Sequence, residues 1–94
     1  MFDVYMPASR PHGTLYIGMT DNLLRRVWEH KSKAVPGFTT KYGIDRLVWY
    51  EPHATLGAAL LREKQLKEWK RAWKLRLIGA FNPEWRDLFD EICG

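Results

Sequence analysis

The stretch Gly13–His30, GTLYIGMTDNLLRRVWEH, decides how this chain folds. Residues 15–17 favour a β-strand, and Gly18 is expected to end it. One of the polar residues 20–22 can cap a helix that starts with a pair of leucines. A strand, a glycine and a capped helix together make a compact frame for a functional site.

One row of this predicted helix is polar. Asn22, Arg26 and His30 are four residues apart and therefore share a row, beside an apolar stripe made by Leu23, Leu24, Val27 and Trp28. Arg26 and His30 lie at the border of that stripe, where the core can hold the stems of side chains whose polar heads face a cleft. This is the placement that an active site needs.

The composition describes one small globular protein. The 94 residues are 46% hydrophobic and include five tryptophans, which is enough for a single core. We expect one domain over residues 1–94, with its core in about residues 1–79 and a short tail over 80–94. The net charge of +4 suits a polyanionic partner, although such a charge is also common in proteins without one.

Cysteine content and hydropathy suggest the compartment. Cys93 is the single cysteine, so no intrachain disulfide can form. The apolar runs are too short to span a bilayer, and the N-terminus lacks a basic segment followed by an apolar one. We therefore expect a cytoplasmic protein that has no contact with a membrane.

The rest of the chain predicts two further strands and several helices. Strands are expected at 2–6, 14–17 and 46–50, with Pro7 and Pro52 ending the first and third because proline cannot donate to a ladder. Helices are expected at about 22–33, stopped by Val35-Pro36-Gly37, at 38–42 before Gly43, and from Thr55 towards Trp73 with a break near 70–72. An apolar pattern then runs to Gly79, and Phe81, Trp85, Leu88 and Phe89 anchor the tail. This order predicts an α+β fold with a three-stranded, mainly antiparallel sheet flanked by helices.

Motifs in this order resemble the GIY-YIG nuclease family. They are Val4-Tyr5 in the first strand, Tyr16-Ile17-Gly18 in the second, Arg26 and His30 on the next helix, and Glu63 on the later one. The resemblance covers almost the whole chain, down to Asn82-Pro83, and is greatest to the small stand-alone bacterial members. The family also includes the nuclease half of the excision-repair incision subunit. The first motif departs from the family pattern, because it reads Asp3-Val4-Tyr5 and lacks its glycine.

The resemblance implies hydrolysis of phosphodiester bonds in nucleic acid, with DNA expected in preference to RNA. It implies that Glu63 holds one divalent cation, Mg²⁺ or Mn²⁺, and that Arg26 clamps the scissile phosphate with its planar fork of donors. Tyr5 and Tyr16 line the cleft, one of them helping to deprotonate the attacking water. His30 accepts or relays a proton, and Asn82 orients a neighbouring group. The chain is expected to be a monomer or a transient dimer.

Each of these residues also has a plain structural explanation. Glu63 is expected within the apolar face of its helix, but it is also placed to pair with Lys67 at the surface, which is worth only ~0.3 to 0.5 kcal/mol. Strand tyrosines are often packing groups, lone histidines often only form hydrogen bonds, and Asn82 can cap a helix. A nucleic-acid-binding module that has lost catalysis is therefore the alternative function.

Other basic and aromatic residues have several possible roles. Basic side chains that rim the cleft would bind phosphates regardless of sequence, or would form an ordinary solvated face. These are Lys31, Lys33, Lys41, Arg46, Lys64, Lys67, Lys70, Arg71, Lys74 and Arg76. Tryptophans can stack on bases, but in so small a core we expect them to be buried.

Overall fold

The computed structural model describes residues 1–34 and 36–94. The predicted stop of the first helix at Val35 thus falls partly outside the described residues. The strands are β1 (Phe2–Ala8), β2 (Gly18–Thr20) and β3 (Arg46–His53). The helices are α1 (Leu23–Ser32), α2 (Phe38–Tyr42), α3 (Leu56–Glu68), α4 (Arg71–Phe81) and α5 (Phe89–Cys93).

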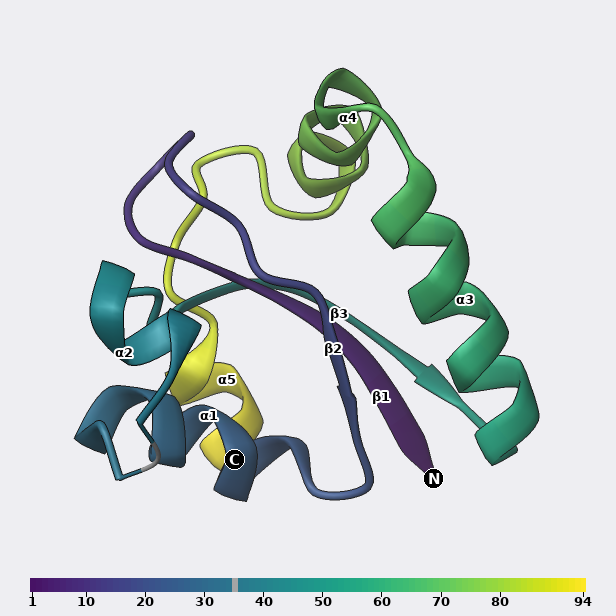
Figure 1. Cartoon of the computed structure of the whole chain (residues 1–94), viewed down its shortest axis with the longest axis horizontal. Helices are drawn as coiled ribbons and strands as arrows, with labels where there is room; N and C mark the ends of the chain where they lie inside the picture. Colours follow the sequence, from purple (N-terminus) through teal and green to yellow (C-terminus); the bar gives the residue numbers. More distant parts are fainter. Residues whose placement is uncertain (35) are drawn as a thin grey trace.

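The three strands form one antiparallel sheet in the order β2-β1-β3. The central position of β1 pairs Tyr5 with Gly18 on one side and with Tyr50 on the other. Figure 1 shows α3 and α4, in green, along one side of the sheet and α1 with α5 on the other. The predicted α+β fold with a three-stranded antiparallel sheet and flanking helices is confirmed.

The first strand does not end at Pro7, as its lack of an N–H had suggested. β1 continues to Ala8, and its pairing with β3 shifts by one residue between Met6 and Pro7. A bulge of this kind is where a sheet tolerates proline, because the missing donor falls at an interruption of the ladder. The Pro7 carbonyl still accepts a hydrogen bond from the Tyr16 backbone N–H at 3.1 Å.

The second strand is also displaced from its predicted position. Leu15 forms only an isolated bridge with Ala8, and regular pairing begins at Gly18, which had been expected to end the strand. Packing against Tyr5 explains the glycine. A Cβ at position 18 would lie 2.8 Å from the Tyr5 hydroxyl oxygen and 2.9 Å from the Tyr16 ring, too close for any side chain.

Local signals placed the helix ends correctly. Asn22 caps α1 by accepting a hydrogen bond from the Arg25 N–H, and Thr55 caps α3 in the same way. Gly43 ends α2 in the left-handed conformation. The break in the long helix is confirmed and falls at Trp69 and Lys70, one to two residues earlier than predicted.

Three element boundaries beyond this point differ from the prediction. β3 runs past Pro52, which is exposed and tolerated because β3 is an edge strand. α4 continues through Gly79 and ends at Phe81, because packing of the helix outweighs the low helix propensity of one glycine. The tail contains α5, which was not predicted.

Two apolar clusters pack on opposite faces of the sheet. The larger one joins alternate residues of β1, such as Val4 and Met6, to Leu66 of α3 and Ile78 of α4. The smaller one joins Tyr5 to α1 and to the tail. No helix in the described part of the chain is long and apolar enough to cross a membrane.

Burial of the tryptophans is only partly as expected. Trp49 and Trp85 are buried, but Trp28 and Trp73 are 55% and 46% exposed. Trp28 lies on α1 and Trp73 on α4, and each helix packs on the sheet through other side chains. These two indoles therefore remain at the surface. Of the aromatic tail anchors, Trp85 is buried whereas Phe81 is 48% exposed.

Candidate active site

Tyr5 lies at the centre of the candidate site. It comes from the middle of β1, and its hydroxyl lies 3.0 Å from Nε2 of His30 on α1. The other ring nitrogen of His30, Nδ1, lies 2.9 Å from the hydroxyl of Thr39 on α2. Three elements that are distant in sequence are thereby joined through one imidazole, and both of its nitrogens have partners.

Electrostatics keep this pair uncharged. Burial raises the pKa of Tyr5 above its ordinary value; the charge of Arg26 opposes this and that of Glu63 adds to it. Burial, followed by the charge of Arg26, lowers the pKa of His30 to about 4, with Glu29 acting in the opposite direction. At neutral pH a phenol therefore faces a neutral imidazole, and the imidazole can accept the phenol proton.

Tyr16 completes an aromatic group around the imidazole. Its ring centroid lies 6.4 Å from that of Tyr5 and 5.9 Å from that of His30. Tyr16 is partly exposed, whereas Tyr5 is only 1% exposed. The two tyrosines thus differ in solvent accessibility: Tyr16 contacts solvent directly, whereas Tyr5 contacts mainly other residues.

Arg26 projects from the same helix as His30 and is held by Glu29. Its Nη1 lies 3.2 Å from a Glu29 carboxylate oxygen, while Arg25 approaches the other oxygen at 3.5 Å. The side chain of Arg25 is 74% exposed and that of Arg26 is 30% exposed. This places Arg25 at the solvated surface and gives Arg26 the more sheltered position near Tyr5.

Glu63 reaches the site from α3. This helix contacts both β1 and the edge strand β2, and the charge of Glu63 acts on the Tyr5 hydroxyl, as that of Arg26 does. The Glu63 side chain is 20% exposed and pairs with Lys67 at 3.4 Å. The surface pair with Lys67 is thus observed, whereas Glu63 acts on Tyr5 only through its charge, from a helix that packs mainly on the opposite face of the sheet.

Asn82 is not brought to this group. It ends α4, on the face of the sheet opposite Tyr5, and is only 3% exposed. Its amide donates to the backbone carbonyls of Val48 and Arg86, and its side-chain oxygen accepts from the Arg86 N–H. These bonds tie the tail to β3, and Asn82 is also the C-terminal cap residue of α4 through its backbone N–H, which donates to the Ile78 carbonyl.

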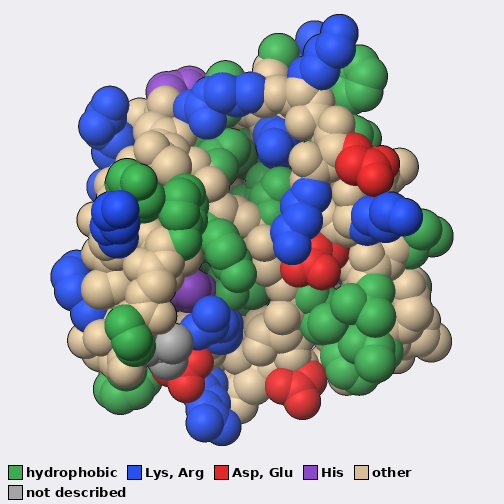
Figure 2. Space-filling model, in the orientation of Figure 1, with side chains coloured by type: hydrophobic (Ala, Val, Ile, Leu, Met, Phe, Trp, Pro, Cys, Tyr) green, Lys and Arg blue, Asp and Glu red, His purple; other side chains and the backbone are tan. Residues whose placement is uncertain are grey.

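A cavity of about 230 Å³ opens beside Arg26 and Tyr16. Residues of the loop before α2 and of α2 itself complete its lining, namely Pro36, Gly37, Phe38 and Thr39. Figure 2 shows a hollow near the middle of the face that it presents, with hydrophobic side chains inside it and both basic and acidic side chains around it. A phosphate that enters beside Arg26 would meet a cation at the rim and aromatic rings below it.

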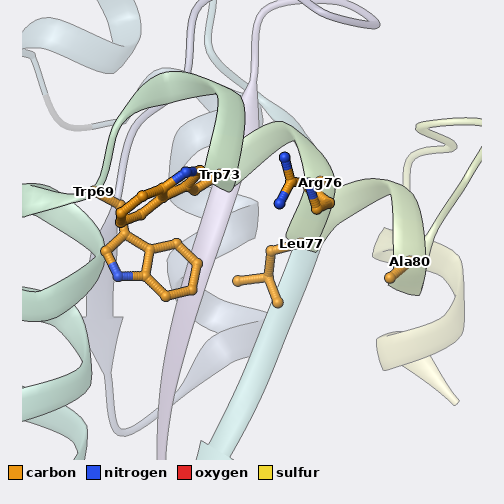
Figure 3. A pocket seen from close by; sticks show the side chains of 5 residues that line it. All are labelled: Trp69, Trp73, Arg76, Leu77 and Ala80. Atoms are coloured by element: carbon orange, nitrogen blue, oxygen red, sulfur yellow. The ribbon is translucent and has the colours of Figure 1, made fainter.

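A larger hollow of about 420 Å³ lies on α4 and contains none of the predicted site residues. It is lined by Trp69, Trp73, Arg76, Leu77 and Ala80. Figure 3 shows the two tryptophans together at one end of it and Ala80 at the other. Its lining lacks a carboxylate and a histidine, so it offers no group for acid–base chemistry.

A divalent cation fits the carboxylate chemistry of the site. Within residues 1–34 and 36–94, no three His, Cys, Asp or Glu side chains are arranged as a ready-made metal cage. Mg²⁺ does not require such a cage, because it keeps several waters and is commonly held by one or two carboxylates together with substrate phosphates. Glu63, whose side chain is 20% exposed, is a carboxylate of this kind.

The sequence analysis identified neither Thr39 nor the ion pair between Arg26 and Glu29. Thr39 orients the imidazole, yet it lies nine residues from His30 on a separate helix, so helical spacing gives no signal for it. Glu29 lies three residues after Arg26, a spacing that permits an ion pair on a helix. That second pair was available from the sequence.

Comparisons with known proteins identify the family of this chain. Residues 1–76 match the profile of the GIY-YIG catalytic domain. A UPF0213 protein from Syntrophus aciditrophicus (strain SB) is 42% identical over 72 residues, which cover 76% of this chain and 82% of that protein. No solved structure matches the chain. The chain therefore belongs to the GIY-YIG catalytic domain family.

Proposed function

We propose that this protein is a metal-dependent endonuclease that hydrolyses phosphodiester bonds of DNA, one strand at each site. The observation that carries the proposal is the group around the Tyr5 hydroxyl: His30 is hydrogen-bonded to it, and the charges of Arg26 and Glu63 act on it. In a member of a nuclease family this arrangement supplies a phosphate clamp, a proton path and a carboxylate for a cation.

Arg26 binds and orients the scissile phosphate. Its guanidinium stays charged and offers two parallel donors to phosphoryl oxygens, and Glu29 limits its rotation by holding Nη1. The negative charge that spreads over the phosphoryl oxygens as water attacks is stabilised by the same fixed cation. Arg25, which is largely solvated, takes no part in this step.

Tyr5 and His30 move the proton of the attacking water. As the water oxygen bonds to phosphorus, its proton passes to the Tyr5 oxygen and the phenol proton passes to Nε2 of His30. The pKa of His30 is low in the free protein, and the negative charge of a phosphate bound to Arg26 raises it, because that charge offsets the effect of the guanidinium. The raised pKa of Tyr5 excludes a free phenolate at neutral pH. Tyr5 must therefore release its own proton to His30 as it takes the proton of the water. The bond from phosphorus to the sugar oxygen breaks, and that oxygen takes a proton from solvent.

In this proposal Glu63 and the substrate phosphate together would hold Mg²⁺ or Mn²⁺. The bound cation would supply Lewis-acid stabilisation of the charge on the phosphoryl oxygens. Glu63 must leave Lys67 to do so, and their 3.4 Å pair near the surface is weak enough to exchange. Because each chain offers one such site, cutting both strands of a duplex requires two encounters or a dimer.

Cleavage assays with site variants test this proposal. Plasmid, single-stranded and branched DNA are incubated with Mg²⁺ or Mn²⁺ and the wild type, Glu63→Gln or Arg26→Ala. Loss of one charge that stabilises the transition state is expected to reduce the rate by about 100- to 1,000-fold. Glu68→Gln and Arg25→Ala are the matched controls, because each removes an exposed charge from the same helix. If neither the wild type nor any variant cleaves any of the substrates, the proposed endonuclease activity is rejected.

The alternative function is binding without catalysis. Two observations favour it: Asp3 stands where the first motif has glycine, and the Glu63 carboxylate already has a cationic partner in Lys67. A gel-shift titration separates the two functions. A binding module retains its affinity for nucleic acid in EDTA and after Glu63→Gln, and it shows no cleavage with either metal.

A further inference from the structure

Two aromatic side chains of α2 lie exposed beside the cavity. Phe38 and Tyr42 are 49% and 50% exposed, and their ring centroids lie 4.8 Å apart. No residue of α2 is buried. Apolar area that stays in water contributes nothing to folding, so core packing does not account for two large rings on this short helix.

These rings continue the aromatic group of the candidate site. Phe38 lines the cavity of about 230 Å³ together with Arg26 and Tyr16. The Tyr16 and Phe38 ring centroids are 6.5 Å apart, and the Tyr5 and Tyr16 centroids are 6.4 Å apart. A line of rings therefore leads from the buried Tyr5, past the arginine, to the exposed face of α2.

Charge around α2 favours an anionic partner. Residues 31–44 contain three lysines and no Asp or Glu. Lys31 is paired with Asp87, whereas Lys41 is exposed, with Nζ 5.4 Å from the centroid of the Tyr42 ring. An exposed ring that takes a base, next to an ammonium that takes a phosphate, is the combination by which proteins bind single-stranded nucleic acid.

We propose that Phe38 and Tyr42 form a stacking subsite for an unpaired base next to the phosphate that Arg26 binds. The inference rests on the proposed function and narrows its substrate to strands with unpaired nucleotides at the cut. Within a continuous duplex each base is already stacked on its neighbours and cannot present its face to Phe38 unless it is flipped out. The subsite therefore favours single-stranded or branched DNA over intact duplex.

The tryptophans of α4 provide an internal comparison. Trp73 is also half exposed and has an ammonium nearby, Lys70 Nζ at 5.9 Å. Its hollow on α4, seen in Figure 3, includes neither Arg26 nor any other predicted site residue. If an aromatic ring beside a lysine were enough for binding, both places would bind bases; the proposal assigns the base to α2 because only α2 shares a cavity with the phosphate clamp.

Photocrosslinking tests the stacking directly. An oligonucleotide with a single 5-iododeoxyuridine is bound to the wild-type protein in EDTA and irradiated, and the crosslinked residue is identified by mass spectrometry. Iodouracil couples to aromatic rings in contact with it, so the proposal expects crosslinks at Phe38 or Tyr42. Crosslinks confined to Trp28 or Trp73 would overturn it.

Affinity measurements give a second test. Fluorescence anisotropy in EDTA compares single-stranded and duplex oligonucleotides of equal length. Phe38→Leu keeps an apolar side chain but removes the ring, and is expected to weaken single-strand binding about 5- to 150-fold. Phe38→Tyr restores the ring and should restore binding, and Trp73→Leu should change it less than about twofold. Equal losses for Phe38→Leu on both substrates, or an equal loss for Trp73→Leu, would contradict the subsite.

The two proposals fail in different ways. Crosslinks at Phe38 without cleavage under any condition would reject the nuclease and keep the subsite. Cleavage that depends on Glu63, but is unaffected by Phe38→Leu on single-stranded and branched DNA, would keep the nuclease and reject the subsite.

Discussion

The face of the sheet that packs against α3 and α4 and the face that packs against α1 and α5 differ in their buried side chains. The first is filled by apolar residues, including Val4, Met6, Leu66 and Ile78. The second has a smaller cluster around Tyr5, and its phenol meets the buried imidazole of His30. One strand supplies both faces because neighbouring residues of β1 point in opposite directions.

This difference separates most of the stability from most of the proposed chemistry, with Glu63 of α3 as the exception. Removing water from apolar side chains is the dominant stabilising contribution in a small domain, and most of that burial lies on the α3 and α4 face. The other face holds polar groups whose burial shifts their pKa values, which is typical of functional sites. Substitutions on the two faces should therefore affect different measurements.

The largest effect is expected from Tyr5→Phe. This change removes the hydroxyl and keeps the ring, so the proton path to His30 is lost while the packing is kept. The cleavage rate should fall by about 100- to 10,000-fold, the usual contribution of a general acid–base group. Thermal unfolding should show a native fold, and an unchanged cleavage rate would remove Tyr5 from the mechanism.

A large effect on stability is expected on the other face. Leu66→Ala empties a fully buried position in α3 and should lower the free energy of unfolding by about 2 to 5 kcal/mol. Leu61→Ala is the matched control on the same helix, because Leu61 is 71% exposed and its loss should cost less than about 0.5 kcal/mol. Urea unfolding measures both values. A similar cost for both variants would show that this cluster does not dominate stability.

A smaller effect is expected in the pH dependence of stability. His30 has a pKa lowered to about 4 in the fold, against 6.5 for an ordinary histidine, so the unfolded chain takes up its proton first as pH falls. Its contribution is complete above pH 6.5 and is lost as pH falls towards 4. Wild type should therefore lose stability more steeply over this range than His30→Gln, which cannot titrate. The free energy of unfolding is measured by urea at several pH values. The same dependence on pH in wild type and His30→Gln would contradict the lowered pKa.

Prediction from sequence succeeded where the signal is local. Asn22 and Thr55 cap their helices through hydrogen bonds within one turn, and Gly43 ends α2 by its own backbone freedom. The motifs predicted one candidate site from Tyr5, Tyr16, Arg26, His30 and Glu63. The fold brings the first four together, and Glu63 acts on Tyr5 through its charge from α3. Asn82 was the exception, since its place depends on where α4 ends and on what the tail covers.

By itself, then, the sequence determined the fold class, the helix caps and the family, because these depend on neighbouring residues and on side-chain identity. Tertiary structure decided the rest. A bulge allows Pro7 within β1, the Tyr5 ring requires Gly18 in the opposite strand, and Thr39 reaches His30 from a helix of its own. Each of these depends on a partner distant in sequence, and so does the exposure of Phe38. Gly13–His30 contributes one tyrosine, the arginine and the histidine, and only folding brings Tyr5 and Glu63 to them.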